Sequence, residues 1–135
     1  MTAAALPDTS WDMNIAARAD RLIDIRKFVE EVAAEMSLDP ERAFDLKVAV
    51  SEACANSVEH AGCEAADLQV AARCANRRLT FTITDRGRFR PPACSSEEFG
   101  NRGLGLPLMV ALMDQVSISR LRDGGTEVSL SILLD

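Results

Sequence analysis

The pattern of apolar and polar positions is clearest in residues 45–61, which contain no glycine or proline and are rich in alanine. This composition predicts a helix. At about 100° per residue, apolar side chains cover most of its circumference, so we expect the helix to be buried. Lys47 and Ser51 interrupt the apolar surface. Five other polar residues gather in one stripe: Asp45, Glu52, Asn56, Glu59 and His60.

This polar stripe has two interpretations. It can be the solvated face of a core helix, as most charged faces are. It can also face a ligand, because Glu52, Asn56 and His60 are spaced i, i+4 and i+8 and therefore lie along one line. A carboxylate can accept a proton, an amide oxygen can bind a metal ion, and an imidazole can hydrogen-bond or titrate. The helix alone leaves both interpretations open.

Periodic patterns elsewhere predict further helices and strands. Asp39 and Pro40 suit the N-cap and first turn of the helix, and Gly62 suits its end. The expected strands are 10–15 (at a sheet edge), 67–74, 79–85, 115–121 and 126–134, and the expected helices are 16–36, 40–61 and 107–114. Strand and helix do not alternate in this order, as a parallel sheet would require. We therefore predict one α+β domain over residues 1–135, a two-layer α/β sandwich with a mostly antiparallel sheet and helices on one face.

Charge and composition narrow the functional classes. The net charge of −6 argues against a nucleic-acid binder that rests on bulk positive charge. Five Phe, one Trp and no Tyr leave few aromatic side chains on which nucleic-acid bases could stack. No apolar run reaches the roughly 18 residues of a membrane span, and the N-terminus lacks the pattern of a signal peptide. We expect a cytoplasmic protein without membrane or direct DNA binding. The four cysteines form no C-x-x-C pair, and Cys54 and Cys74 are expected to be small buried apolar residues.

The first helix is basic in its N-terminal half, at Arg18, Arg21 and Arg26, and acidic in its C-terminal half. This order opposes the helix dipole. The charges can form a solvated face or a docking surface for an acidic partner, and the sequence favours neither. Residues 86–101, rich in Gly, Pro and Ser, form a loop long enough to suggest a functional segment.

Four separated motifs need one explanation. They are Glu52-x-x-x-Asn56 on the helix, Asp85-Arg86-Gly87 at a strand end, Arg102-Gly103-Leu104-Gly105-Leu106 before a helix, and Gly125-Thr126 at the start of the last strand. Each is weak alone. Glycines before a helix expose backbone N–H groups to an anion. An aspartate at a strand end can accept a hydrogen bond from the exocyclic amine of a purine.

In this order and spacing the motifs resemble the GHKL (Bergerat) ATP-binding fold over nearly the whole chain. The form Glu-Ala-x-x-Asn-Ser-x-x-His around Asn56 and the ending Gly-Leu-Gly-Leu-Pro-Leu-Met are similar to the anti-sigma-factor serine/threonine kinases of bacterial stress and sporulation control. The resemblance implies a kinase that uses ATP and Mg²⁺, sequesters a sigma factor and phosphorylates a serine or threonine of a STAS-type anti-anti-sigma partner. It also implies a homodimer, formed largely through the first strand and helix. Our own prediction, from the charges of the first helix, places the partner face at Arg18, Arg21 and Arg26.

Carried over by position, the resemblance implies a role for each motif residue. Glu52 would be the catalytic base and Asn56 the Mg²⁺ ligand. Asp85 would bind the adenine amino group. The remaining nucleotide contacts would be Gly87 beside the ring, Thr126 at the adenine end, and Arg102, Gly103, Leu104 and Gly105 around the phosphates, under a lid at about 90–100. Residues 1–8 are expected to be flexible.

One position departs from the family pattern. The motif D-x-G-x-G reads Asp85-Arg86-Gly87-Arg88-Phe89, so a phenylalanine stands in place of the second glycine. This leaves a second hypothesis, a partner-binding regulator with weak or no nucleotide binding. A histidine kinase is disfavoured, because the only histidine is His60, inside the expected ATP site.

Overall fold

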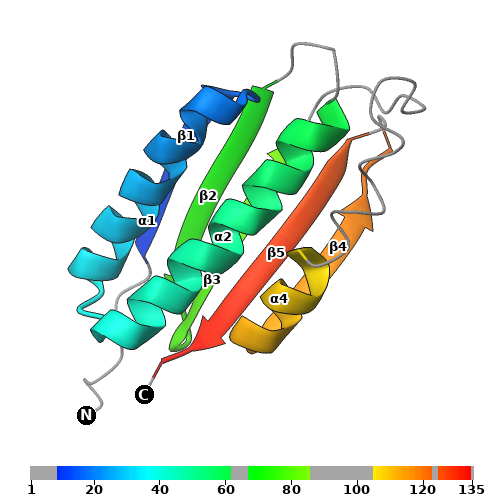
Figure 1. The fold of residues 1–135 in the computed structure, drawn as a ribbon. Coiled ribbons are helices and arrows are strands. Elements are labelled where there is room, and N and C mark those ends of the chain that lie inside the picture. The colour runs from blue at the N-terminus through cyan, green and yellow to red at the C-terminus, as the bar shows by residue number, and fades with distance from the viewer. Residues whose placement is uncertain (1–8, 62–66, 86–104, 123–124, 135) are drawn as a thin grey trace.

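The computed structural model describes residues 9–61, 67–85, 105–122 and 125–134, with the side chains of 59–61 and 105–107 left out. The chain forms helices and strands in the order in which the sequence predicts them (Figure 1). A 3-10 turn, η2, precedes the first helix at Ala19–Arg21. The helices are α1 (Leu22–Glu35), α2 (Pro40–Ala61) and α4 (Gly105–Leu112); the strands are β1 (Thr9–Ala16), β2 (Asp67–Ala75), β3 (Arg78–Asp85), β4 (Gln115–Arg120) and β5 (Thr126–Leu133).

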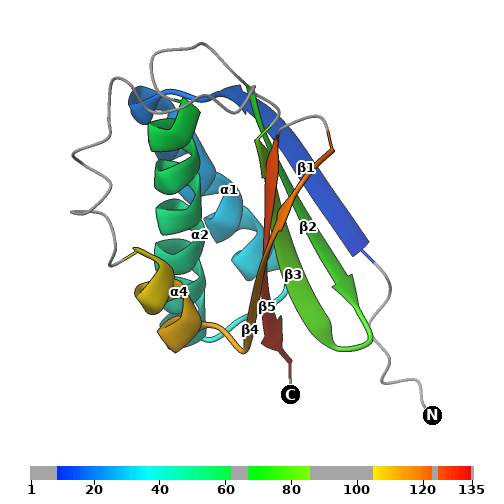
Figure 2. The same ribbon diagram turned by 90° about the vertical axis from the view of Figure 1, so that its right-hand side faces the viewer.

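The described strands form one five-stranded sheet in the order β1-β2-β3-β5-β4, and every neighbouring pair is antiparallel. All three helices cover the same face, and Figure 2 shows the other face without a second layer. The predicted two-layer α+β sandwich is therefore confirmed. The expected position of the first strand at an edge is confirmed as well.

Strict alternation explains the central hairpin. In β3, every second residue from Leu79 to Asp85 is buried, and the residues between are partly exposed. Asn76 and Arg77 both have positive φ, 55° and 62°. Two successive positive φ angles suit the tight turn that joins strands of right-handed twist. The register of this hairpin is thereby fixed, with Leu68 opposite Asp85.

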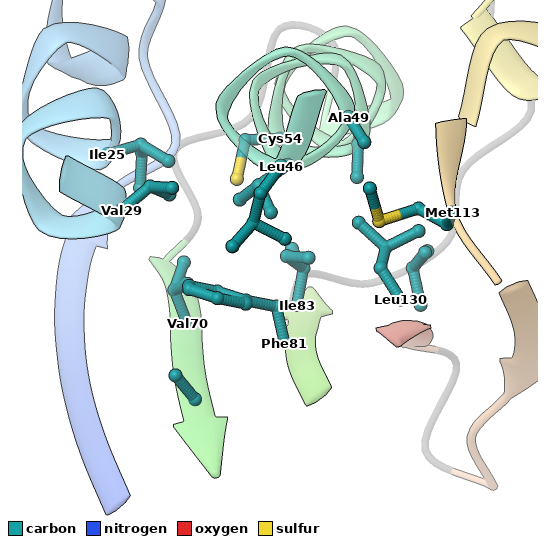
Figure 3. Close-up of a cluster of buried hydrophobic side chains, with 14 of the residues drawn as sticks. Ile25, Val29, Leu46, Ala49, Cys54, Val70, Phe81, Ile83, Met113 and Leu130 are labelled. Carbon is teal, nitrogen blue, oxygen red and sulfur yellow. The ribbon is translucent and has the colours of Figure 1, made fainter. Parts of the chain in front are cut away.

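The core lies between the sheet and the helices (Figure 3). Phe81 is fully buried and meets Phe28 of α1 edge-to-face, with ring centroids 6.0 Å apart. Cys54 and Cys74 are buried free thiols, as expected. Burial raises the pKa of Cys54 from 9.0 to about 12, because a thiolate cannot be solvated there.

Two sequence predictions about the helices were wrong. The first helix does not begin at residue 16: β1 continues to Ala16, Arg18 is extended, and α1 begins only at Leu22. The helix around Glu52 is not buried all round, because Phe44 is 60% exposed on its outer side. That side faces away from the sheet, and no described element covers it. In the described part of the chain, none of the helices is both long and apolar enough to span a membrane.

Candidate functional site

The side of α2 that faces α4 carries the predicted catalytic residues. In Figure 3, Cys54 points toward Ile25 and Val29 of α1, whereas Ala49 points toward Met113, just after α4. Glu52 and Asn56 follow Ala49 by three and seven residues, so they lie on the same side of the helix. Both are partly buried. Glu52 and Asn56, the middle of the polar stripe, therefore lie on the side of α2 that turns toward α4.

The adenine end of the expected site is formed by two adjacent strand ends. Asp85 is the last residue of β3 and is only 8% exposed. It pairs with Thr126, the first residue of β5. Gly125 is buried beside them, and a β-carbon there would overlap the main-chain carbonyl oxygen of Asp85. The two backbones thus approach as closely as they do because residue 125 has no side chain.

Helix α4 is anchored at its far end by a small polar cluster. The Asp114 carboxylate accepts a hydrogen bond of 2.7 Å from the backbone N–H of Leu133. Arg42 of α2 donates to the carbonyl oxygen of Leu133 and lies 3.7 Å from the Asp114 carboxylate. Since this cluster joins the start of α2 to the residues after α4, the two helices run in opposite directions, and the N-terminal end of α4 lies toward the C-terminal half of α2 (Figure 1).

A helix N-terminus beside an amide and a carboxylate suits an anionic ligand with a metal ion. The helix end attracts negative charge, and Mg²⁺ is usually held by one or two protein oxygens together with substrate phosphates. Among the described residues there is no group of three His, Cys, Asp or Glu side chains that could hold a metal ion alone. The amide oxygen of Asn56 is a ligand of the kind that Mg²⁺ accepts, and its role in binding Mg²⁺ stays a prediction.

Several predicted site residues lie outside the described residues. These are Gly87, Phe89, Arg102, Gly103, Leu104 and the expected lid at 90–100. His60 belongs to α2, but its side chain is outside the description as well. Of the predicted site residues that the structure describes, Asp85 pairs with Thr126 at adjacent strand ends, Glu52 and Asn56 lie on α2, and Gly105 is the first residue of α4.

The predicted partner-binding arginines are all exposed, but two of them are paired locally. Arg18 binds Asp20 at 2.7 Å, and Arg21 binds Asp24 at 3.2 Å. Arg26 lies on the exposed side of α1. Farther along, Glu30 accepts a hydrogen bond from Lys47, which lowers the pKa of Glu30. Part of the charge on α1 therefore serves contacts within the chain.

Two features escaped the sequence prediction. The packing role of Gly125 was signalled only by its place before Thr126, and it was not among the predicted contacts. The Arg42–Asp114 cluster joins residues far apart in the chain and leaves no local pattern. Neither a periodicity nor a motif marks such a contact, so only the fold reveals it.

Comparison with known proteins identifies the family. A family model for the histidine kinase-like ATPase domain matches residues 15–132. The chain belongs to this family. It is similar to the serine-protein kinase RsbW of Bacillus pumilus, with 33% identity over 92% of this chain and 85% of the relative. It is also 31% identical to RsbW of Bacillus subtilis, over 79% and 76% of the two chains.

Solved structures show the same fold. The RsbU and RsbW domains of Rv1364c from Mycobacterium tuberculosis match with a TM-score of 0.72 and 25% identity over 93% of this chain. The chain spans 32% of the length of that protein. The SiaB–SiaC complex from Pseudomonas aeruginosa matches with a TM-score of 0.69 over 90% of this chain and 88% of that chain, but at 14% identity it supports the fold alone.

Proposed function

We propose that this histidine kinase-like ATPase domain binds Mg·ATP and transfers the γ-phosphoryl group to a serine or threonine of a STAS-type anti-anti-sigma protein. Its other activity is to sequester a sigma factor. Phosphorylation weakens the binding of the STAS partner to this chain, so the two activities together make a switch. The proposal is supported by the similarity to RsbW serine-protein kinases over 92% of the chain.

The single observation that supports the nucleotide part is the pairing of a buried Asp85 with Thr126 at adjacent strand ends. Glu52 and Asn56 share the α4-facing side of α2, while Asp85 and Thr126 pair where β3 ends and β5 begins. Asp85 is a buried carboxylate, which suits an acceptor for the adenine amine. Gly105 begins α4, whose N-terminus favours phosphate. We assign the remaining contacts to Gly87, Arg102, Gly103 and Leu104.

In the reaction, Glu52 takes the proton of the attacking hydroxyl of the substrate serine or threonine. The hydroxyl oxygen forms a bond to the γ-phosphorus at the same time. The bond from that phosphorus to the bridging oxygen breaks, and ADP leaves with the electron pair. Asn56 would hold Mg²⁺, which when bound would neutralise charge on the phosphates. Such a reaction depends mainly on positioning and charge stabilisation, which a rigid helix face provides.

The partners bind elsewhere on the chain. We assign the face around Arg18, Arg21 and Arg26 to an acidic partner surface, with Arg26 contributing most because Arg18 and Arg21 are already paired. If charge reversal at Arg26 leaves sigma-factor and STAS binding unchanged, this assignment is wrong. A second copy of the chain is the third expected partner.

Calorimetry with Mg·ATP tests the nucleotide site. The wild type should bind, and Asn56→Ala should bind at least about tenfold more weakly, because Mg²⁺ loses its protein ligand. Asn14→Ala is the matched control, since Asn14 is exposed on β1, away from the site. Equal affinity of the Asn56→Ala and Asn14→Ala variants would contradict the assignment.

Glu52→Gln separates binding from catalysis. This variant should keep ATP binding and lose phosphoryl transfer to a STAS protein by about 10²–10⁴-fold, the usual contribution of a general base. Glu41→Gln, in the first turn of the same helix, is the matched control. The alternative, a partner-binding regulator without catalysis, is favoured by Phe89 in place of a family glycine. It predicts sigma-factor binding without transfer in the wild type.

A further inference from the structure

Strand β4 forms one edge of the sheet, and in the described part of the chain no further strand lies beyond it. An edge strand presents main-chain groups that another strand can join, and proteins usually block such an edge with proline or charged side chains. The segment from Gln115 to Ser119 contains neither. The opposite edge strand, β1, carries the carboxylate of Asp12 at its middle. The two edges of the sheet are therefore not equally protected.

The hydrogen-bond pattern shows which residues of β4 face the open edge. The N–H of Leu121 donates to the carbonyl oxygen of Gly125 at 2.7 Å, and these residues continue the register of β4 and β5 by one pair. In an antiparallel pair, hydrogen-bonded and non-hydrogen-bonded positions alternate. Ser119 therefore bonds to β5 as well, whereas Val116 and Ile118 direct their N–H and C=O groups to the open edge.

An apolar side chain lies beside this open edge, on the face of the sheet that the helices cover. Val116 pairs with Leu130 and Ile118 pairs with Val128, and both partners belong to the core. Paired residues point their side chains to the same face of a sheet, so Ile118 points to the helix side. Ile118 is nevertheless 52% exposed. The helix layer of the described chain therefore leaves part of the apolar surface of β4 uncovered.

Helix α4 extends this apolar surface. The helix contacts β4, and the two run in opposite directions (Figure 1). Leu112 and Val116 both pack against the core. Leu108 lies one turn before Leu112, and Ile118 lies two residues after Val116, so both are displaced along the sheet in the same direction by about 6 Å. Leu108 is 38% exposed. The two exposed side chains therefore lie at the same level of the sheet.

We propose that the open edge of β4 binds an extended segment of a partner protein, which adds one strand to the sheet, antiparallel to β4. The outward N–H and C=O groups of Val116 and Ile118 form main-chain hydrogen bonds with this segment. Every second side chain of the segment is apolar and covers Ile118 beside Leu108. In complexes of this kind, main-chain bonds provide affinity and the alternate side chains provide specificity. The proposed function assigns no contact to this edge.

The charges at the two ends of β4 favour one direction of the added strand. Arg120 ends the strand and Arg122 follows it, and both are exposed. Asp114, just before the strand, lies 3.7 Å from Arg42 and is thus paired within the chain. The N-terminal end of an antiparallel segment lies beside the arginines. The partner segment therefore begins with an acidic residue, followed by alternating apolar and polar residues.

A synthetic peptide tests the edge directly. The probe is an acetylated peptide of about eight residues, in which valine and threonine alternate after an N-terminal aspartate. Hydrogen exchange measured by NMR should show the N–H groups of Val116 and Ile118 exchanging at least about tenfold more slowly with saturating peptide. The N–H of Ser117 faces β5 and is the internal control, with little change expected.

Two results of this titration would overturn the proposal. The first is protection of the Val116 and Ile118 N–H groups in the chain without peptide, because the edge would then already be covered. The second is no saturable binding up to about 1 mM peptide, which corresponds to a binding free energy weaker than about −4 kcal/mol.

N-methylated peptides separate strand addition from general apolar contact. Methyl groups on the alternate amides that face β4 should weaken binding at least about tenfold, because those N–H groups bond to the edge. Methyl groups on the other alternate set should leave binding within about threefold, because those N–H groups face away. An equal loss from the two sets would refute strand addition.

Variants of the chain test the same contacts from the other side. Ile118→Pro removes an outward N–H but no bond to β5, so it should weaken peptide binding at least about tenfold. Ile118→Val keeps the N–H and is the matched control, expected to bind like wild type. Equal affinity of the two variants would contradict the proposal.

Arg122→Glu tests the direction of the segment. It should weaken binding of the peptide with the N-terminal aspartate at least about threefold and leave a peptide with threonine in its place unchanged. Tighter binding of a peptide with the aspartate at its C-terminal end would overturn the antiparallel direction. Calorimetry with Mg·ATP on Ile118→Pro and Arg122→Glu should match wild type, so a failure at the edge is distinguishable from a failure of the nucleotide site.

Discussion

Gly125 should not tolerate even one methyl group. A β-carbon at this position would overlap the carbonyl oxygen of Asp85 and lie 3.4 Å from Leu121 Cδ1. The obstacle is backbone rather than a flexible side chain, so β3 and β5 must separate where the site is formed. Overpacking of this kind lowers the free energy of unfolding by about 3 kcal/mol at the upper end. Alanine raises it by about 0.4–1 kcal/mol, because it restricts the unfolded chain more than glycine does. We expect Gly125→Ala to lower the free energy of unfolding by roughly 2 kcal/mol.

Thermal denaturation and nucleotide titration together check this value. The melting temperature should fall by roughly 6 °C, and ATP affinity by at least about tenfold, because Asp85 and Thr126 are displaced. Ser129→Ala, on the same strand but without a clash, is the control and should melt within about 2 °C of wild type. If Gly125→Ala melts and binds ATP like the control, the close approach of the two strands is not what positions Asp85.

Three further predictions concern the scaffold. Because burial raises the pKa of Cys54 from 9.0 to about 12, the thiolate forms first in the unfolded chain, and the free energy of unfolding should fall as pH rises from about 9 toward 12. Urea titrations of wild type and Cys54→Ala at pH 8 and 10.5 check this, and equal pH sensitivity of the two would contradict it. Asp114→Ala removes the acceptor of the Leu133 N–H and should cost about 1–3 kcal/mol in the same titration, whereas a loss below about 0.5 kcal/mol would show that Arg42 alone anchors α4. Asp39→Ala removes the cap of α2, a 2.8 Å bond from the Arg42 N–H, and should cost about 1 kcal/mol; an unchanged urea midpoint would mean that water replaces the cap.

The architecture was predictable because local patterns and global packing agree. The alternation in β2 and β3 predicted the hairpin, and Asp39 and Pro40 predicted where α2 begins. The start of α1 was not predictable in the same way. Residues 16–21 are compatible with helical spacing, but the pairing of Ala16 with Asp67 keeps the chain extended, and that contact is remote in sequence.

The members of the candidate site were proposed from the sequence and stay predictions, whereas the contacts that support the site could not be predicted at all. Glu52 and Asn56 were identified by their spacing, and Asp85 by its place at a strand end. The close approach at Gly125 depends on the distance between two backbones, and the Arg42–Asp114 cluster depends on how α4 returns along α2. Both are properties of tertiary packing, which periodicity does not record. The exposure of Phe44 likewise depends on the absence of a second layer over α2 among the described elements.

The most direct test of the account is nucleotide selectivity, measured by calorimetry with Mg·ATP and Mg·GTP on wild type and Asp85→Asn. If Asp85 accepts the adenine amine, the wild type binds ATP and binds GTP at least about tenfold more weakly, because guanine presents a carbonyl at that position. Asp85→Asn should lose most of the ATP affinity and with it the preference. Wild-type protein that binds neither nucleotide at millimolar concentration, or an Asp85→Asn variant that keeps the full preference for ATP, would contradict the assignment of this end of the fold as the ATP site.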